Sequence, residues 1–326
     1  MQTTRLGDLE VSVIGLGCMS MSQSYGAADR GESERTLHQA LDLGVTFFDT
    51  ANAYGFGHNE ELIGEVLSSR RQEFTLATKF AIVKHADGRR TIDARPDQIA
   101  ARCEESLKRL RTDVIDLYYQ HRLDPNVPIE DSVGAMADLV TAGKVRYLGL
   151  SEISAKTLRR AHAVHPITAV QSEYSLFTRD PEDHVLPACR ELGVGFVPFS
   201  PLCRALLTGK LRDMAPLGDK DLRAGLPRFQ GSNFIANLKL VDRFEQIAAE
   251  LNATPAQLAL AWLLAKGTGI APIPGTKHLA NLVENVDAAT IVLDEAGISR
   301  LDELFVAGNV AGERYSDALM KSIDRD

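Results

Sequence analysis

Four residues whose side chains could move a proton stand at or just after the ends of apolar runs in the first half of the chain. They are Asp49, Tyr54, Lys79 and His121. A tyrosine hydroxyl, with an ordinary pKa of about 10, is a poor acid at neutral pH. A nearby ammonium stabilises the phenolate and lowers that pKa, and a carboxylate keeps the ammonium charged and oriented. A histidine can hydrogen-bond a carbonyl oxygen or relay the proton. The set therefore predicts a site that protonates an oxygen as negative charge develops on it, which is carbonyl reduction or, in reverse, alcohol oxidation.

The elements that must position these residues alternate along the chain. Short runs rich in Val, Ile, Phe and Thr are typical of strands, and the longer amphipathic stretches between them have helical period. The predicted strands are Val13–Leu16, Thr46–Asp49, Thr75–Lys79, Val114–Gln120, Val145–Leu150, Ala169–Gln171, Gly195–Ser200 and Ile270–Ile273. The predicted helices are Glu32–Leu43, Asn59–Ser68, Pro96–Leu110, Ile129–Ala142, Ala155–Ala163, Asp183–Leu192, Leu238–Ala265 and His278–Val286.

Eight strand-then-helix units predict an α/β fold, a closed (β/α)8 TIM barrel that forms one domain over residues 1–326. The alternative is an open doubly wound sheet. Thr3–Ser12 reads as a β-hairpin that turns at Gly7 and Asp8 and could plug the barrel floor. The C-terminal segment is expected to form a tail over the pocket.

In such a barrel the active site lies at the C-terminal ends of the strands. Further polar residues follow the predicted strands at these positions. They are Gln120, Arg122, Ser151, Glu152, Gln171 and Ser200. One polar strand end means little, but an aspartate, a lysine and a histidine that close three successive strands, next to Tyr54, are a much stronger signal.

Composition and charge exclude several classes of protein. The chain has 326 residues and a formal net charge of −8, which argues against a nucleic-acid-binding protein because phosphate neutralisation needs clustered Lys and Arg. Its four cysteines are far apart and form no metal-ligand spacing, so we expect neither a metal nor a disulfide framework. No apolar stretch approaches the roughly 20 residues that span a membrane. We therefore expect a cytoplasmic protein with no membrane contact.

Several motifs resemble those of the aldo-keto reductases, in the same order and over essentially the whole chain. They are FFDTANAYGFGHNEELIGEVL, TLATK, DLYYQHR, GLSE, AVQSEYSLF, FSPL, LLTGKL, IPGTKHLANLVEN and GERYSDALM. The likeness is greatest to the bacterial, plant and fungal subgroup that is similar to potassium-channel β subunits. The resemblance implies a (β/α)8 barrel that binds NADPH or NADP+ without a Rossmann domain and reduces aldehydes or ketones.

The resemblance also assigns roles to residues. It implies that Asp49, Tyr54, Lys79 and His121 are the catalytic tetrad, with Tyr54 as general acid. Ser151 and Gln171 match residues that hold the nicotinamide carboxamide, and Phe199 stands where relatives place an aromatic ring against the nicotinamide. The other residues expected at the cofactor are Asp49 and Glu152, the pyrophosphate segment Ser200, Pro201, Leu202, Cys203, Arg204 and Lys210, and the adenosine-phosphate end Gly275, Lys277, Asn281, Glu284 and Asn285. Cys18 and Met19 join this set because the first strand ends there.

Two departures from the family pattern concern the cofactor. Relatives often have L-G-x-G where this chain has Leu202–Ala205 with Cys203 and Ala205 at the glycine positions, and the loss of glycine could stiffen the loop. An arginine often follows the lysine of the I-P-G-T-K motif, but His278 stands there. Because a guanidinium is the better phosphate ligand, this change weakens the preference for NADPH over NADH.

The substrate pocket is expected to be apolar. We expect its lining to be Met19, Tyr25, Phe56, Phe80, Tyr174, Tyr315 and the segment Arg212–Asn233. Aromatic side chains without fixed charge favour a small-molecule carbonyl compound that is neutral and fairly bulky. The alternative function is an NADP(H)-binding, redox-sensing regulatory subunit with little turnover. The sequence does not indicate the oligomeric state.

Overall fold

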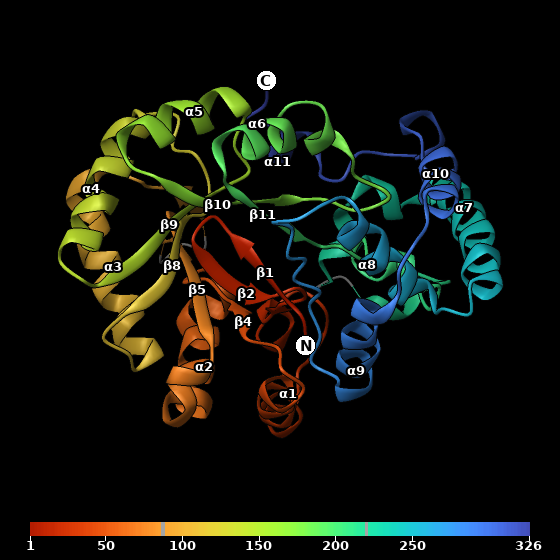
Figure 1. Cartoon of the computed structure of the whole chain (residues 1–326), viewed down its shortest axis with the longest axis horizontal. Coiled ribbons are helices and arrows are strands. Elements are labelled where there is room, and N and C mark those ends of the chain that lie inside the picture. Colours follow the sequence, from red (N-terminus) through yellow and green to blue (C-terminus); the bar gives the residue numbers. More distant parts are fainter. Residues whose placement is uncertain (86–88, 219–220) are drawn as a thin grey trace.

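Seven parallel strands form the centre of the molecule. The computed structural model describes residues 1–85, 89–218 and 221–326. The strands are hydrogen-bonded in the order β11-β10-β9-β8-β5-β4-β3, and helices surround them (Figure 1). Their bounds are β3 (Leu16–Gly17), β4 (Phe47–Asp49), β5 (Thr75–Phe80), β8 (Ile115–Gln120), β9 (Val145–Ser151), β10 (Ile167–Glu173) and β11 (Gly195–Phe199). Since sequential strands are neighbours and parallel, the open doubly wound alternative is excluded.

The segment at the predicted eighth strand, Ile270–Ile273, closes the sheet without forming a regular strand. It bridges β11 through Phe196 and Ile270 on one side, and Gly17 and Gly275 pair on the other. Pro272 and Pro274 explain the irregularity, because proline has no N–H to donate to a ladder. The structure therefore confirms a nearly closed parallel barrel.

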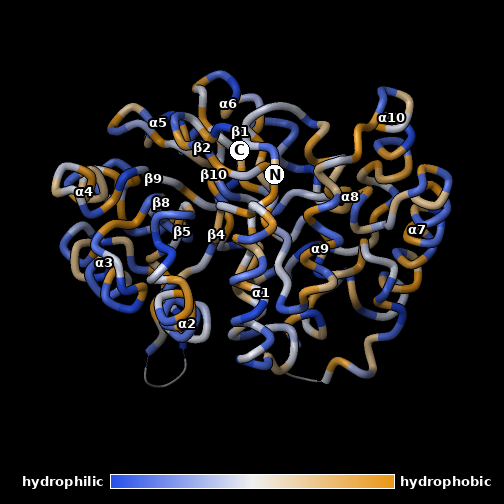
Figure 2. Tube along the Cα trace, turned by 60° about the horizontal axis from the view of Figure 1, so that its bottom comes forward, coloured by the Kyte–Doolittle hydropathy of each residue, from blue (hydrophilic) through white to orange (hydrophobic). Residues whose placement is uncertain are grey.

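The helices cover the outside of the barrel, and hydrophobic and hydrophilic residues alternate along them (Figure 2). Their bounds are α1 (Arg30–Asp42), α2 (His58–Leu67), α3 (Pro96–Leu110), α4 (Ile129–Thr141), α5 (Ala155–Val164), α6 (Val185–Leu192), α7 (Gly231–Glu250), α8 (Pro255–Ala265), α9 (Leu279–Asp287), α10 (Glu295–Leu304) and α11 (Asp317–Met320). None of the described helices has the length and apolar character needed to cross a membrane.

The prediction of one helix over Leu238–Ala265 is wrong, because the chain breaks between α7 and α8. Asn252 has a left-handed backbone with φ of 53°. The Thr254 side chain then accepts a hydrogen bond from the Gln257 N–H, and Gln257 reciprocates in a capping box. Pro255 suits the first turn of α8. The sequence therefore contains signals for the end of α7 and the start of α8, although the apolar pattern continues through both. The patterns also do not predict α10 or the hairpin β6 (Ile82–Lys84) and β7 (Arg90–Ile92).

The N-terminal hairpin closes the floor of the barrel, as expected. β1 (Thr3–Leu6) pairs antiparallel with β2 (Leu9–Ser12). Leu6, Leu9 and Val11 are buried in one cluster with barrel-interior residues such as Tyr119 and Val197. The site must therefore lie at the opposite end, where the strands terminate.

The C-terminal segment is tied back onto the barrel. The carboxylate of Asp324 accepts a hydrogen bond from the Ser154 N–H at 2.9 Å. That of Asp326 accepts from Ala155 at 2.8 Å and from Lys156 at 3.2 Å. Negative charge at the N-terminus of α5 is favourable because the first N–H groups of a helix are unpaired. This anchoring holds the segment after α11 at the start of α5, close to the end of β9.

The contact between the hairpin and β11 gives a stability prediction. A Cβ added at Gly195 would lie 2.5 Å from Leu6 Cα, which is backbone and cannot easily shift. Gly195→Ala should therefore lower the free energy of unfolding by about 1–3 kcal/mol through overpacking. Gly134→Ala is the matched control, because Gly134 in α4 has open space around its Cα. It should be neutral or stabilising by up to about 1 kcal/mol. Denaturant titration measures both, and equal stability of the two variants would contradict this packing.

Candidate active site

A buried ion pair joins the ends of β4 and β5. The Lys79 ammonium contacts Asp49 Oδ1, and both side chains are almost wholly buried. Lys79 also donates to the Thr50 carbonyl at 2.8 Å. The other carboxylate oxygen, Asp49 Oδ2, accepts from Gln171 Nε2 at 2.8 Å. The two charges are thus fixed by partners from three strands.

Tyr54 lies within reach of this pair. Its hydroxyl oxygen is 3.3 Å from Lys79 Nζ. The residue begins a short 3-10 turn, Tyr54–Gly57, that leads into α2. The turn is held from outside, because the Gln23 side chain accepts a hydrogen bond from the Gly55 N–H at 3.0 Å.

His121 stands beside Tyr54, directly after β8. The two rings meet edge to face with centroids 5.9 Å apart. Burial lowers the pKa of His121 well below its ordinary value, and the charges of Arg122 and Lys79 act in the same direction. The imidazole is therefore neutral at pH 7 and can donate one N–H. The structure brings Asp49, Tyr54, Lys79 and His121 into one cluster.

The pKa of Tyr54 differs from the expectation drawn from the sequence, which is that a nearby ammonium lowers it. Burial raises the pKa of Tyr54, and this outweighs the lowering by the Lys79 charge. Burial also opposes the charge on Lys79, but Asp49 and Tyr54 outweigh it and raise the Lys79 pKa. The lysine does favour the phenolate, as expected, yet Tyr54 remains protonated because its hydroxyl is buried.

A cavity of about 460 Å³ opens onto this cluster and extends to α9. Its lining includes Asp49, Tyr54 and His121 but not the fully buried Lys79. Fifteen of the eighteen residues expected at a cofactor line it. They are Met19, Asp49, Ser151, Gln171, Phe199, Ser200, Pro201, Leu202, Arg204, Lys210, Gly275, Lys277, Asn281, Glu284 and Asn285.

The other three expected residues, Cys18, Glu152 and Cys203, lie behind the cavity wall. Cys18 and Cys203 are fully buried in the hydrophobic core. Glu152 is buried in an ion pair with Arg314. Each is next to a lining residue in the chain, but none of the three lies in a strand, and Glu152 and Cys203 have a left-handed backbone with φ of 54° and 45°. Adjacency in sequence therefore does not place these side chains in the cavity.

The expected substrate lining needs a larger correction. Phe80 and Tyr174 are core residues, since Phe80 stacks on Tyr118 and Tyr174 packs against Phe196 and Trp262. Phe56 is half exposed and does not line the cavity. Met19, Tyr25 and Tyr315 do line it. From the segment 212–233, of which 219–220 lie outside the described residues, only Leu222 and Arg223 reach it.

Arginines also line the cavity, contrary to the expected absence of fixed charge. Arg122, Arg204 and Arg223 all face it. Arg122 directly follows His121 at a strand end, and this position is the sequence signal that could have placed Arg122 in the cavity. Arg223 lies in an irregular segment, where no periodic pattern indicates which side chains point inward.

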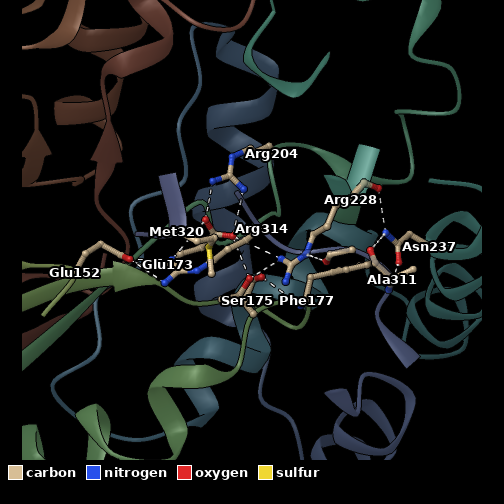
Figure 3. Close-up of polar contacts among 12 residues, drawn as sticks. Glu152, Glu173, Ser175, Phe177, Arg204, Arg228, Asn237, Ala311, Arg314 and Met320 are labelled. Atoms are coloured by element: carbon tan, nitrogen blue, oxygen red, sulfur yellow. Dashed lines mark hydrogen bonds and ion pairs between the residues drawn. The ribbon is translucent and has the colours of Figure 1, made fainter. Parts of the chain in front are cut away.

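A second set of buried charges holds the loop after β11 (Figure 3). Glu173, at the end of β10, accepts from Arg204 in a two-point contact of 2.6 and 3.2 Å. Arg228 lies 3.6 Å and Arg314 3.9 Å from the same carboxylate. Burial opposes the charge of Glu173, but these arginines outweigh it and lower its pKa. The network therefore links β10, the loop, the segment before α7 and the C-terminal segment.

The loop itself has an unusual backbone. Ser200, Cys203, Arg204 and Ala205 all have positive φ, between 45° and 76°. Such left-handed conformations cost a non-glycine residue about 1–2 kcal/mol. Relatives often have glycine at the positions of Cys203 and Ala205, and the left-handed backbone gives the physical reason. In this chain the Glu173–Arg204 contact compensates by fixing the strained segment.

The comparisons with known proteins agree with this geometry. A sequence profile described as the aldo/keto reductase family matches residues 13–305. "Probable aldo-keto reductase 1" of Glycine max is 45% identical over 98% of this chain and 93% of its own length. The aldo-keto reductase yakc of Schizosaccharomyces pombe, whose name specifies NADP(+), is 44% identical over 96% of this chain and 94% of its own length.

Solved structures give the same result. The glycerol dehydrogenase of Gluconobacter oxydans superposes with a TM-score of 0.86 at 30% identity, covering 94% of this chain and 96% of that one. An aldo/keto reductase of Klebsiella pneumoniae, solved with NADP and acetate, superposes with a TM-score of 0.74 at 28% identity, covering 99% of each chain. The barrel and the cluster at its strand ends define an oxidoreductase of the TIM-barrel class. The chain belongs to the aldo/keto reductase family.

The charge network gives a stability prediction. Glu173→Gln should lower the free energy of unfolding by about 3–5 kcal/mol, because it leaves buried arginines without their counter-charge. Glu191→Gln is the control, since Glu191 pairs with Arg159 on the surface and should cost less than about 1 kcal/mol. Thermal or denaturant unfolding measures the difference. A cost for Glu173→Gln as small as that of the control would contradict the network's role.

Proposed function

We propose that this protein is an NADP(H)-dependent carbonyl reductase. It transfers a hydride from the nicotinamide to an aldehyde or ketone, and the reverse alcohol oxidation is possible. The observation that carries the proposal is the Tyr54 hydroxyl at the cavity wall, 3.3 Å from the ammonium of Lys79. The family supports it, as does the relative whose name specifies NADP(+).

The cavity suits an elongated dinucleotide with phosphates. It runs from the catalytic cluster to Asn281, Glu284 and Asn285 on α9, and the cations Lys210 and Lys277 line it on the way. When bound, NADPH supplies the hydride. Ser151 and Gln171 would hold the carboxamide, and Phe199 would pack against the nicotinamide ring. Because Gln171 Nε2 is bonded to Asp49, its carbonyl oxygen is the atom left to accept from the amide.

The phosphate end supports NADPH over NADH through Lys277. Its ammonium donates to the carbonyls of Tyr25 and Ala27, the former at 2.9 Å, and no carboxylate of the described residues forms an ion pair with it. His278 has a carboxylate partner, Glu32, at 2.7 Å. The residue that replaces the common arginine is therefore engaged, and Lys277 is the cation that would bind the 2′-phosphate.

The protein's own part in the reaction is proton donation. Tyr54 gives its hydroxyl proton to the carbonyl oxygen while His121 donates an N–H to the same oxygen and orients it. Lys79, held charged by Asp49, stabilises the phenolate that is left. The carbonyl compound occupies the part of the cavity near Met19, Tyr25 and Tyr315, whose side chains are apolar or aromatic.

Tyr54→Phe tests the assignment of the acid. It should lower kcat for any carbonyl substrate by a factor of about 10² or more, because general acid catalysis contributes that much. The dissociation constant for NADPH should stay within about twofold, since the hydroxyl acts only on charge that develops in the transition state. Steady-state kinetics and fluorescence titration measure the two quantities. Equal loss of cofactor affinity would contradict the role, and tight binding by the wild type without any turnover would favour the redox-sensing subunit.

The pKa of Tyr54 predicts a pH profile. A general acid acts in its protonated form, so reduction should be lost as pH rises through the Tyr54 pKa. Burial raises that pKa above its ordinary value, which is about 10. The kcat/KM for reduction should therefore be flat from pH 6 to about pH 9 as far as Tyr54 controls it. A decline centred near pH 7 that Tyr54→Phe abolishes would contradict the raised pKa.

A further inference from the structure

The cations that line the cavity differ in whether a carboxylate of the protein pairs with them, and the proposed function does not explain this difference. Arg204 is paired with Glu173, Arg223 with Asp221 and Lys210 with Glu284. Arg122 also lines the cavity, next to Tyr54 and His121, yet no carboxylate of residues 1–85, 89–218 or 221–326 forms an ion pair with it. At the catalytic end, Arg122 is the arginine whose partner the described chain does not supply.

The hydrogen bonds of Arg122 fix its guanidinium and leave one edge available. Nη1 donates to the His121 carbonyl at 2.7 Å and lies 3.3 Å from Ser151 Oγ. A guanidinium has five N–H groups. Those on Nε and Nη2 form no hydrogen bond within the described residues, and neither atom is among the buried polar atoms without a partner. This edge is therefore accessible, and its two nitrogens have the spacing that binds both oxygens of a carboxylate.

The position of this edge relates it to the reacting carbonyl. Arg122 directly follows His121 in the chain, and its Nη1 is bonded to the His121 backbone. The group that would orient the carbonyl oxygen and the group that would bind an anion are therefore adjacent. The positive charge is also close enough to lower the pKa of both Tyr54 and Tyr315 against the effect of burial. An anion bound by Arg122 would therefore lie close to His121 and to the Tyr54 hydroxyl, where the reacting carbonyl is proposed to bind.

We propose that Arg122 binds a carboxylate of the substrate, and that the preferred substrates are carbonyl compounds with a carboxylate next to the carbonyl group, such as 2-oxo acids with an apolar substituent. This inference rests on the proposed function and replaces the neutral substrate that the sequence favoured. Hydride adds to the carbonyl carbon, Tyr54 supplies the proton to the carbonyl oxygen, and the carboxylate is unchanged. The product is a 2-hydroxy acid, and the apolar substituent packs against Met19, Tyr25 and Tyr315.

A matched pair of substrates tests the proposal. Phenylglyoxylate and its methyl ester have the same carbonyl and ring and differ in charge. With NADPH, the wild type should have the higher kcat/KM for the acid. Arg122→Gln should lower kcat/KM for the acid by roughly 10- to 100-fold, mainly through KM, because it removes a charge-assisted two-point contact. The value for the ester should change less than about threefold, and Arg122→Lys should recover part of the loss for the acid.

The control is Arg159→Gln, which removes an arginine charge from the outer surface of α5, where Arg159 pairs with Glu191. It should change neither substrate's kcat/KM. The proposal is overturned if Arg122→Gln reduces the acid and the ester equally, or if the wild type prefers the ester. Equal losses would mean that Arg122 assists the reaction in general rather than binding the anion.

An equilibrium measurement separates this proposal from the proposed function. Calorimetric titration of the protein–NADP+ complex with mandelate and with mandelamide requires no turnover. Mandelate should bind the wild type at least roughly tenfold more tightly than Arg122→Gln does, and mandelamide should bind both alike. If no carbonyl compound is reduced but this difference appears, the reductase assignment fails and Arg122 is still an anion site. If the difference is absent, the anion site is overturned.

Discussion

The contact on which the site depends is the buried ion pair between Asp49 and Lys79. Neither charge is stable at this depth alone, because each would lose its hydration. Together the two charges neutralise one another. Lys79 also donates a hydrogen bond to the Thr50 carbonyl, and Asp49 accepts one from Gln171. The barrel makes this possible, since neighbouring parallel strands bring their C-terminal ends to one place. The result is a fixed ammonium 3.3 Å from the Tyr54 hydroxyl at the cavity wall. In the proposed reaction, this charge stabilises the phenolate that proton donation leaves.

A second set of buried charges extends the same principle to the rest of the cavity. Glu173 at the end of β10 holds Arg204, and with it a loop whose backbone glycine would adopt more easily. Arg314 connects this centre to the C-terminal segment, and the Tyr315 ring contacts the guanidinium groups of Arg204 and Arg314. The loop after β11 and the C-terminal segment, which both line the cavity, are thus fixed by one group of charges. Arg122 differs from these arginines in lacking such a partner among the described residues, which is why a substrate carboxylate is the partner we assign to it.

Much of the fold and part of the site follow from local sequence signals. Six barrel strands form where the apolar runs predict them, whereas the first strand, predicted over Val13–Leu16, forms only at Leu16–Gly17. The polar residues at the strand ends converge as the barrel requires. The prediction of one continuous helix over Leu238–Ala265 is wrong because the apolar periodicity continues through the capping box at Thr254. The prediction that Phe80 and Tyr174 line the cavity is wrong for another reason. An aromatic residue at or next to a strand end can point into the core or into the cavity, and only the packing decides which. The network around Glu173 joins residues more than a hundred positions apart, and no local pattern in one sequence indicates such pairings.

The measurement that tests the account most directly is the transfer of deuterium from NADPH, labelled with deuterium at both positions on C4 of the nicotinamide, to a carbonyl substrate. Mass spectrometry measures this transfer in wild type and Lys79→Met. We expect the wild type to place the label on the carbinol carbon. At saturating NADPH, Lys79→Met should transfer the label at least roughly 10²-fold more slowly, because the phenolate of Tyr54 loses its counter-charge. Transfer at an unchanged rate in Lys79→Met, or no transfer by the wild type, would contradict the central role of the Asp49–Lys79 pair.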